Sequence, residues 1–317
     1  MNFSGFESIT AAPINDTLAC VASASTIPPC VVTFAPHGKE KPQVIFRSLP
    51  HKDCSDTFSE ASSLSWRSTN DEKVHGLYYP PVLSGNADLP PAIVFSHGGP
   101  TSQHTMEFHP EVQFFTTRGY AVLQVNYRGS TGYGRQYMLK LRRGWGKIDC
   151  EDVVSGAQYL VENGLADPHR LVIMGSSAGG ATALLALIHH PGMFRAGVCS
   201  YAVSNMVSLS TDTHKFEARY LDTMLGPLPE AEEIYRCRSA LCHADKIRDA
   251  VIVFHGADDP VVPREQSDGI ADALRRNGVP YEYHVFEGEG HGWRKTKTIE
   301  AYYTILKAFL IKHVMSE

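Results

Sequence analysis

The sequence predicts an α/β protein whose mostly parallel sheet is covered by helices on both faces. Several short runs are apolar without alternation, as expected for strands that are buried on both sides. Helical stretches lie between or after these runs, and strands that alternate with helices form parallel sheets. The apolar runs are Ala92–Ser96, Ala121–Asn126, Leu171–Met174, Ala196–Ser200, Val251–His255 and Tyr283–Phe286. The helical stretches are Glu151–Glu162, Ala178–His189, Arg264–Asn277 and Ile299–Ile311.

The first sixty residues have a different pattern, which is typical of β structure. Runs rich in Val, Ile and Phe are separated by the turn-forming Pro28-Pro29 and His37-Gly38-Lys39. The predicted strands are Leu18–Ala24, Cys30–Ala35 and Gln43–Leu49, and the polar stretch Cys54–Ser65 is interpreted as a linker. We therefore expect an N-terminal β-strand segment with its linker over residues 1–60 and the α/β domain over residues 61–317.

Composition excludes several classes of protein. The 317 residues carry 29 Lys and Arg against 34 Asp and Glu, a net charge of −5, with 43% hydrophobic residues. This is ordinary globular composition with ample length for a large core. The negative balance gives no electrostatic reason to expect a nucleic-acid partner. Leu171–Ile188 is uncharged, but its glycine-rich middle reads as a turn, so no membrane span is expected.

Cysteine and histidine usage favours a cytoplasmic protein without a metal. The seven Cys are odd in number and form no CxxC, which is typical of reduced thiols inside cells. The first basic side chain is Lys39, so the start of the chain does not resemble a secretory signal. The 15 His are scattered and no HExxH motif occurs.

The strongest chemical signal is GSSAG, residues 175–179, which places Ser177 at the centre of a G-x-S-x-G motif. An apolar strand runs into the motif and a helix rich in Ala and Leu runs out of it. A nucleophilic serine at such a strand–turn–helix elbow needs small neighbours, which Gly175, Gly179 and Gly180 supply. The start of the helix also offers backbone N–H groups to the reacting centre. The motif predicts a nucleophile on an α/β-hydrolase fold.

A serine nucleophile needs a base and an orienting carboxylate, which follow in the order Ser, acid, His on this fold. Asp258 and Asp259 come after the strand Val251–His255, at the sheet edge where α/β sites assemble. His291 lies in the glycine-rich segment after Tyr283–Phe286. Either aspartate is a candidate acid, and the other is a candidate helix N-cap.

Two further glycine-containing segments, HGGP and YRGSTGYG, bear on the chemistry. HGGP, residues 97–100, follows an early strand, where glycine N–H groups stay open to a developing oxyanion. The N–H of Ala178 is the second candidate donor. YRGSTGYG, residues 127–134, is neither G-x-G-x-x-G nor a P-loop. No cofactor is therefore expected.

Taken together, these residues resemble the catalytic domain of the prolyl oligopeptidase (S9) family of serine peptidases, and most of all its acylaminoacyl-peptidase and dipeptidyl-peptidase-like branch. The matching pieces, from about Trp66 onward, are HGGP, NYRGSTGYG, GWGKIDCED, GSSAGG, THKFEARYLD, DPVVP and GEGHGW. The resemblance implies Ser177 as nucleophile, Asp259 as acid and His291 as base. It also implies oxyanion donors at the N–H groups of Gly99 and Ala178.

The N-terminal segment departs from the family pattern. Family members normally carry a seven-bladed β-propeller that covers the active site, whereas about 60 residues precede the hydrolase here. The stretch VASASTIPPCVVTF resembles the last strands of such a propeller. A chain without the rest of the propeller implies a more open site and does not favour strict dipeptidyl-peptidase activity. Its exposed strand edges permit a homo-oligomer.

The sequence thus predicts a serine hydrolase that works by acyl transfer. A peptidase of the S9 type acting on short or N-acylated peptides is the main interpretation. The alternative is a carboxylesterase or a hydrolase of small esters, thioesters or lactones, and a non-catalytic scaffold is the third reading. The residues expected to contact the substrate are His97, Tyr127, Tyr201, Val203, Phe216 and Tyr220.

Overall fold

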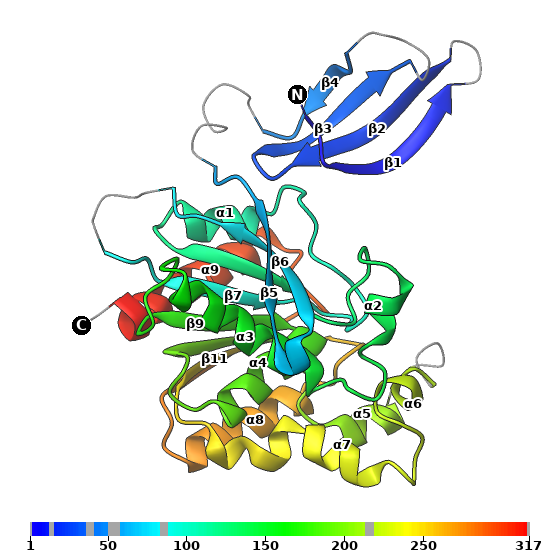
Figure 1. The fold of residues 1–317 in the computed structure, drawn as a ribbon. Helices are drawn as coiled ribbons and strands as arrows, with labels where there is room; N and C mark the ends of the chain where they lie inside the picture. The colour runs from blue at the N-terminus through cyan, green and yellow to red at the C-terminus, as the bar shows by residue number, and fades with distance from the viewer. Residues whose placement is uncertain are drawn as a thin grey trace. The chain divides into compact units, whose positions relative to one another are not determined.

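The computed structural model describes residues 2–12, 16–35, 41–49, 58–82, 88–212 and 219–315. The chain divides into two compact units (Figure 1). The first contains residues 1–63, 77–87 and 105–122, and the second contains residues 64–76, 88–104 and 123–317. The predicted turn His37-Gly38-Lys39, the start of the predicted linker and Phe216 lie outside the described residues.

The first unit contains a four-stranded antiparallel sheet in the order β1-β2-β3-β4. Its strands are β1 (Gly5–Ala12), β2 (Thr17–Ala24), β3 (Ile27–Phe34) and β4 (Gln43–Arg47). Cys20, Ala22, Cys30 and Val32 form a small buried cluster on β2 and β3. The three predicted strands are confirmed. The structure adds β1, whose residues after Gly5 are exposed and give no buried alternation to recognise.

The main sheet has eight strands in the order β12-β11-β10-β9-β7-β8-β6-β5. Each neighbouring pair in the row β7, β9, β10, β11, β12 is parallel. This confirms the predicted sheet type. β5 begins at Ser62, so the predicted linker Cys54–Ser65 is wrong at its C-terminal end. The strands are β5 (Ser62–Arg67), β6 (Lys73–Tyr79), β7 (Ala92–Ser96), β8 (Ala121–Asn126), β9 (Leu171–Ser176), β10 (Ala196–Ser200), β11 (Ala250–Gly256) and β12 (Tyr281–Phe286).

The four predicted helices are present as α3, α4, α8 and α9, with ends that shift by up to three residues. Five shorter α-helices, two 3₁₀ turns and a terminal π-helical turn complete the described residues. The helices are α1 (Pro110–Thr116), α2 (Arg135–Leu139), α3 (Ile148–Glu162), α4 (Ala178–His189), α5 (Met206–Asp212), α6 (Tyr220–Met224), α7 (Glu232–Arg238), α8 (Glu265–Arg276) and α9 (Thr296–Leu310). The short turns are η2 (Thr69–Asp71), η3 (Ala240–Lys246) and η4 (Ile311–Met315).

Helices cover both faces of the sheet at β11. The side chain of His255 meets α8, where its Nδ1 lies 2.7 Å from the Ser267 hydroxyl. The ring of Phe254 packs on Tyr302 of α9, with ring centroids 4.7 Å apart. Because adjacent residues of a strand point to opposite faces, α8 and α9 lie on opposite sides of the sheet. The prediction of a doubly covered sheet is confirmed here.

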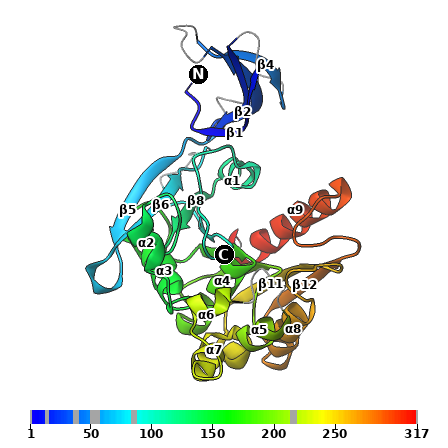
Figure 2. The same ribbon diagram turned by 90° about the vertical axis from the view of Figure 1, so that its right-hand side faces the viewer.

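Helix α4 is buried along its whole length up to Ile188, because it packs on β9 and β10 and against α3. The uncharged stretch Leu171–Ile188 is thus a buried strand, a turn and a buried helix. Among the described residues, no helix combines the length and the apolar character that a membrane crossing requires. The short helices α5, α6 and α7 gather together in both views (Figures 1 and 2).

Candidate active site

Ser177 is the single residue between β9 and α4, at the turn that the motif predicts. Its backbone has φ 56° and ψ −124°, a conformation that is costly for a residue with a side chain. The turn is tight enough to demand glycine on both sides. A Cβ on Gly175 would lie 2.1 Å from the carbonyl oxygen of Gly179, and a Cβ on Gly179 would lie 2.1 Å from that of Ser96. The N–H of Ser177 donates to the carbonyl of Ser200 at the end of β10 (3.0 Å).

Asp259 and His291 are brought together by the loops after β11 and β12. The Nδ1 atom of His291 lies 2.7 Å from Oδ2 of Asp259. The other carboxylate oxygen accepts the N–H groups of Val261 (2.8 Å) and Val262 (3.0 Å). Burial raises the pKa of the Asp259 carboxyl, but these hydrogen bonds outweigh it and hold the pKa below its ordinary value. The carboxylate therefore stays ionised and orients the imidazole.

Asp258, the other candidate acid, is exposed, and it is Asp259 whose carboxylate meets His291. Its N–H donates to the carbonyl of Glu289 (2.9 Å), which joins the two loops. Neither aspartate caps α8, because the N-cap of that helix is Arg264 without a side-chain hydrogen bond. The structure thus distinguishes the two neighbours that the sequence left open.

The loop that carries His291 is held by a buried carboxylate, Glu289, that no pattern in the sequence marks. Glu289 accepts the N–H groups of Arg294 (3.0 Å) and Lys295 (2.9 Å). Gly256 allows this loop to pass close to β11, since a Cβ there would lie 2.2 Å from the carbonyl oxygen of Gly290. These contacts fix the loop before any substrate arrives.

An aromatic cluster packs around the imidazole of His291. The ring of Tyr201 lies 4.4 Å from it and 5.4 Å from the ring of Trp293, measured between centroids. Tyr201 follows β10 directly and has φ 39°, another positive value at a residue with a side chain. Of the residues expected to contact substrate, Tyr201 is therefore placed against the histidine.

A second histidine, His255, lies next to Asp259 and was not among the residues predicted from the sequence. His255 is fully buried, and its Nε2 lies 3.0 Å from the carbonyl of Val262 and 3.8 Å from Oδ2 of Asp259. Burial lowers the pKa of His255, so the ring is neutral near pH 7. It sits within β11 rather than in a motif, and no local pattern marks it.

The HGGP loop passes close to Ser177. A Cβ on Gly98 would lie 3.2 Å from the carbonyl oxygen of Ser176 and 4.0 Å from Oγ of Ser177, and Gly99 has φ 121°. Ala178 is the first residue of α4, so its N–H belongs to the helix end that has no intrahelical acceptor. The geometry places the candidate donors Gly99 and Ala178 on the walls of the same cavity as Ser177.

His97 and Tyr127 lie behind this loop. His97 is 6% exposed and Tyr127 is fully buried, with ring centroids 4.2 Å apart. The Tyr127 hydroxyl lies 2.9 Å from the carbonyl of Pro100, and Nε2 of His97 lies 2.7 Å from the Ser130 hydroxyl. Burial lowers the pKa of His97 to about 4, so it is uncharged near neutral pH. This burial fits support of the loop rather than contact with a substrate.

A small cavity of about 50 Å³ opens beside Ser177 and Ala178. Val203 and Tyr220, both expected to contact substrate, line it. The Tyr220 hydroxyl lies 2.6 Å from Oγ1 of Thr101 and so ties α6 to the HGGP loop. The apolar part of the wall is formed by Trp145, Val203, Leu209, Leu221, Val261 and Val262.

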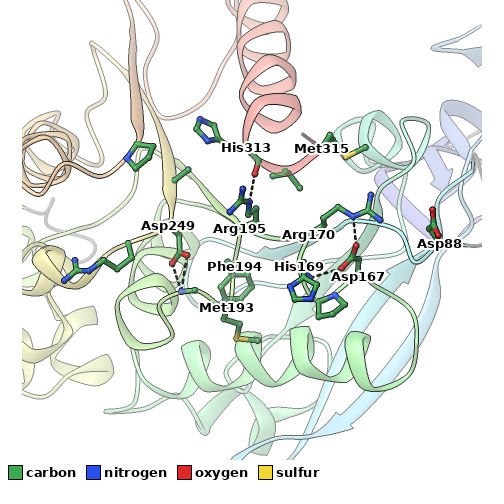
Figure 3. A pocket seen from close by; sticks show the side chains of 16 residues that line it. Asp88, Asp167, His169, Arg170, Met193, Phe194, Arg195, Asp249, His313 and Met315 are labelled. Carbon is green, nitrogen blue, oxygen red and sulfur yellow. Dashed lines mark hydrogen bonds and ion pairs between the residues drawn. The ribbon is translucent and has the colours of Figure 1, made fainter. Parts of the chain in front are cut away.

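A much larger cavity, of about 760 Å³, lies at the other end of the strands (Figure 3). It is lined by residues near the starts of β9, β10 and β11, whereas Ser177 follows the end of β9. Two of its arginines have local partners: Nε of Arg170 lies 2.6 Å from Oδ2 of Asp167, and Nε of Arg195 donates to the carbonyl of His313 (2.9 Å). This cavity contains none of the candidate catalytic groups.

No group of three His, Cys, Asp or Glu among the described residues is placed to hold a metal ion. A serine at a strained elbow with a glycine loop beside it, and a histidine bound to a carboxylate, are the features of the α/β-hydrolase fold.

The comparisons place the chain in a family. The model of the prolyl oligopeptidase family matches residues 106–317. The chain belongs to this family, which confirms the resemblance inferred from the motifs. It is 31% identical over 232 residues to dipeptidyl aminopeptidase BIII of Pseudoxanthomonas mexicana, a match that covers 71% of this chain and 34% of the relative. It is 29% identical over 220 residues to the acylamino-acid-releasing enzyme of Arabidopsis thaliana, covering 67% and 29%.

Solved structures give the same assignment. A puromycin-hydrolyzing peptidase of Mycobacterium tuberculosis matches with a TM-score of 0.93 and 36% identity, over 99% of this chain and 49% of the other. The match therefore includes the N-terminal segment as well as the hydrolase. The chain spans about a third of the length of the curated relatives and about half that of the solved chain.

Proposed function

We propose that this protein is a serine peptidase that cleaves short or N-acylated peptides through Ser177, His291 and Asp259. The observation that carries the proposal is the 2.7 Å contact between His291 and Asp259, formed by loops at the same sheet edge as the Ser177 elbow. A carboxylate that accepts from Nδ1 fixes the tautomer in which Nε2 is free to accept the serine proton.

The proposed reaction is an acyl transfer in two halves. Ser177 Oγ attacks the carbonyl carbon while Nε2 of His291 takes its proton, and the N–H groups of Gly99 and Ala178 stabilise the oxyanion. Each such donor is worth roughly 3 kcal/mol in the transition state. The imidazolium then protonates the leaving amine as the C–N bond breaks. Water, deprotonated by the same histidine, releases the acyl group from Ser177.

A peptidase is favoured over the alternative carboxylesterase or small-ester hydrolase by the relatives. Three relatives that are similar in sequence or structure are named as a dipeptidyl aminopeptidase, an acylamino-acid-releasing enzyme and a puromycin-hydrolyzing peptidase. All three names describe cleavage of an amide bond. A non-catalytic scaffold has no need for the strained serine and the ordered histidine together.

The cavity beside Ser177 supports a preference for small apolar acyl groups. About 50 Å³ is well below the roughly 150 Å³ that a buried site needs to hold a benzene ring. None of the described residues that line it carries a charged side chain. We therefore propose acetyl-amino acids with a short aliphatic side chain as the first substrates to test.

The proposal is tested by turnover of N-acetyl-alanyl p-nitroanilide and p-nitrophenyl butyrate by the wild type and by S177A. The peptidase proposal requires anilide cleavage that the S177A variant loses. Cleavage of the ester alone would support the carboxylesterase instead. Turnover of neither substrate, or equal turnover by the variant, would reject the Ser177 mechanism.

We further propose a reducing compartment, the cytoplasm, and self-association through the four-stranded sheet. The reducing compartment is supported by the cysteines: the described residues include six that form no disulfide, and four of these are buried. The second is supported by exposed apolar side chains on its edge strands, Ile9 of β1 and Ile45 and Phe46 of β4. An edge strand with free N–H and C=O groups is a ready partner for another copy.

A further inference from the structure

We propose that Trp145 is a specificity-determining residue whose indole N–H donates a hydrogen bond to the carbonyl oxygen of the substrate's N-acyl group or preceding residue. The inference rests on the proposed peptidase function and names a contact on the acyl side of the cleaved bond. It gives a role to the segment GWGKIDCED, which the triad leaves unused.

The first observation is a buried donor without an acceptor. Trp145 is 2% exposed, and its Nε1 finds no hydrogen-bond partner among the residues that the structure describes. A buried N–H that has lost its water and gained no acceptor destabilises the folded protein. Trp66 shows the ordinary arrangement in the same chain, since its Nε1 donates to the Ser155 hydroxyl at 2.9 Å.

The second observation is location. Trp145 lines the cavity that also contains Ser177 and Ala178, which are the proposed nucleophile and an oxyanion donor. A peptide whose reactive carbonyl sits at Ser177 presents its next carbonyl oxygen within the same region of the site. If that carbonyl oxygen accepts the indole N–H, the donor is no longer unsatisfied. Binding of the substrate is then strengthened by a hydrogen bond that the free protein does not make.

The third observation is that this wall is fixed to the nucleophile helix. Asp149 accepts the N–H of Gly146, the residue after Trp145, at 2.6 Å. Its other oxygen accepts the hydroxyl of Thr182 in α4 at 2.5 Å. The carboxyl is fully buried, and burial raises its pKa to about 6. Burying a carboxyl group is unfavourable, and here the group links the segment of Trp145 to α4, the helix that follows Ser177. We interpret the link as a means of holding Trp145 in position for binding.

The experiment compares two esters that differ only in the proposed acceptor. N-acetyl-alanine p-nitrophenyl ester carries the acetamido carbonyl, whereas p-nitrophenyl propionate has the same carbon chain without it. In W145F, which removes the N–H and keeps an aromatic ring, we expect kcat/KM to fall about tenfold for the first ester and less than twofold for the second. W66F, which removes the other buried indole N–H, is the matched control and should lower both rates equally or not at all.

A measurement on the substrate side keeps the test independent of how the variant folds. Thioacetyl-alanine p-nitrophenyl ester has sulfur, a weaker acceptor, in place of the acetyl oxygen. The wild type should favour the oxygen ester by several-fold, and W145F should lose this preference. An equal loss on both esters in W145F, or no oxygen preference in the wild type, overturns the Trp145 contact. Ser177-independent turnover of every ester would instead reject the proposed function.

Discussion

Asp258 and Asp259 are adjacent in sequence but differ in what surrounds each carboxylate. Asp259 accepts from His291 and from two backbone N–H groups, whereas Asp258 is exposed and contributes only a backbone contact. A role in catalysis follows from the surroundings and not from the residue type. This pair therefore provides a test in which the control is one position away.

We expect D259N to lower kcat by about 10⁴, because an amide at this position stabilises the wrong histidine tautomer and does not support the imidazolium. D258N should change kcat by less than threefold. Both values come from steady-state turnover of N-acetyl-alanyl p-nitroanilide, with circular dichroism to check folding. Equal losses in the two variants would show that Asp259 is not the orienting acid.

Asp149 makes stability depend on pH in a direction opposite to that of most carboxyls. Burial raises its pKa to about 6 in the folded protein, above the ordinary value of 3.8. Between these two values the folded state binds more protons than the unfolded state, so the free energy of unfolding falls as pH rises. Relative to D149N, the wild type should lose on the order of 3 kcal/mol between pH 4 and pH 7. Urea unfolding of both proteins across this range measures the difference, and parallel curves would contradict it.

At the scale of elements, the turn between β9 and α4 depends on the absence of side chains. A Cβ on Gly179 would lie 2.1 Å from the backbone oxygen of Ser96 in β7, so either the helix or the strand must move. We expect G179A to lower the free energy of unfolding by about 2–3 kcal/mol and to reduce turnover, because Ser177 is carried by the same turn. G269A, within α8, is the control, since its Cβ would meet only the mobile end of Leu241 at 3.1 Å. Equal stability in the two variants, measured by urea unfolding, would contradict the close contact.

The elements that the sequence predicted are those with a strong local pattern. The strand before Ser177 and helix α4 were predictable because an apolar run meets a glycine turn and then an alanine-rich stretch. Strand β1 was missed because its residues are exposed, and helices α1, α2, α5, α6 and α7 because five to seven residues carry too little periodicity. The boundary of β5 was missed because its serines resemble a linker.

Within the site, the same distinction separates motif residues from their supports. Ser177, Asp259 and His291 each lie in a short motif that can be recognised from its own segment of the sequence. His255 and Asp149 have partners on other elements, and Glu289 accepts backbone N–H groups five and six residues further along its own loop. No local signal in the sequence marks such a buried carboxylate or a neutral histidine. Trp145 lies in the GWGKIDCED motif, to which the sequence alone assigns no role. Only the fold shows that Trp145 lines the same cavity as Ser177 and that its N–H has no acceptor among the described residues.

At the scale of the whole molecule, the four-stranded sheet has exposed apolar side chains on its edge strand β4. Phe46 is 65% exposed and Ile45 is 62% exposed. If this edge joins two copies, F46K should shift the mass measured by light scattering at micromolar concentration from dimer to monomer, because like charges then meet at the contact. I311K, which replaces an exposed apolar residue outside this sheet, should leave the mass unchanged. A wild type that is monomeric across the concentration range would reject self-association.

The central claim is that Ser177 is a nucleophile activated by a histidine, and covalent labelling tests it most directly. A fluorophosphonate reacts with an activated serine hydroxyl and leaves its phosphonyl group on that oxygen. Peptide mass spectrometry of the labelled wild type should locate one adduct at Ser177, and H291A should react far more slowly. No adduct in the wild type, or an adduct at another serine that persists in S177A, would contradict the account.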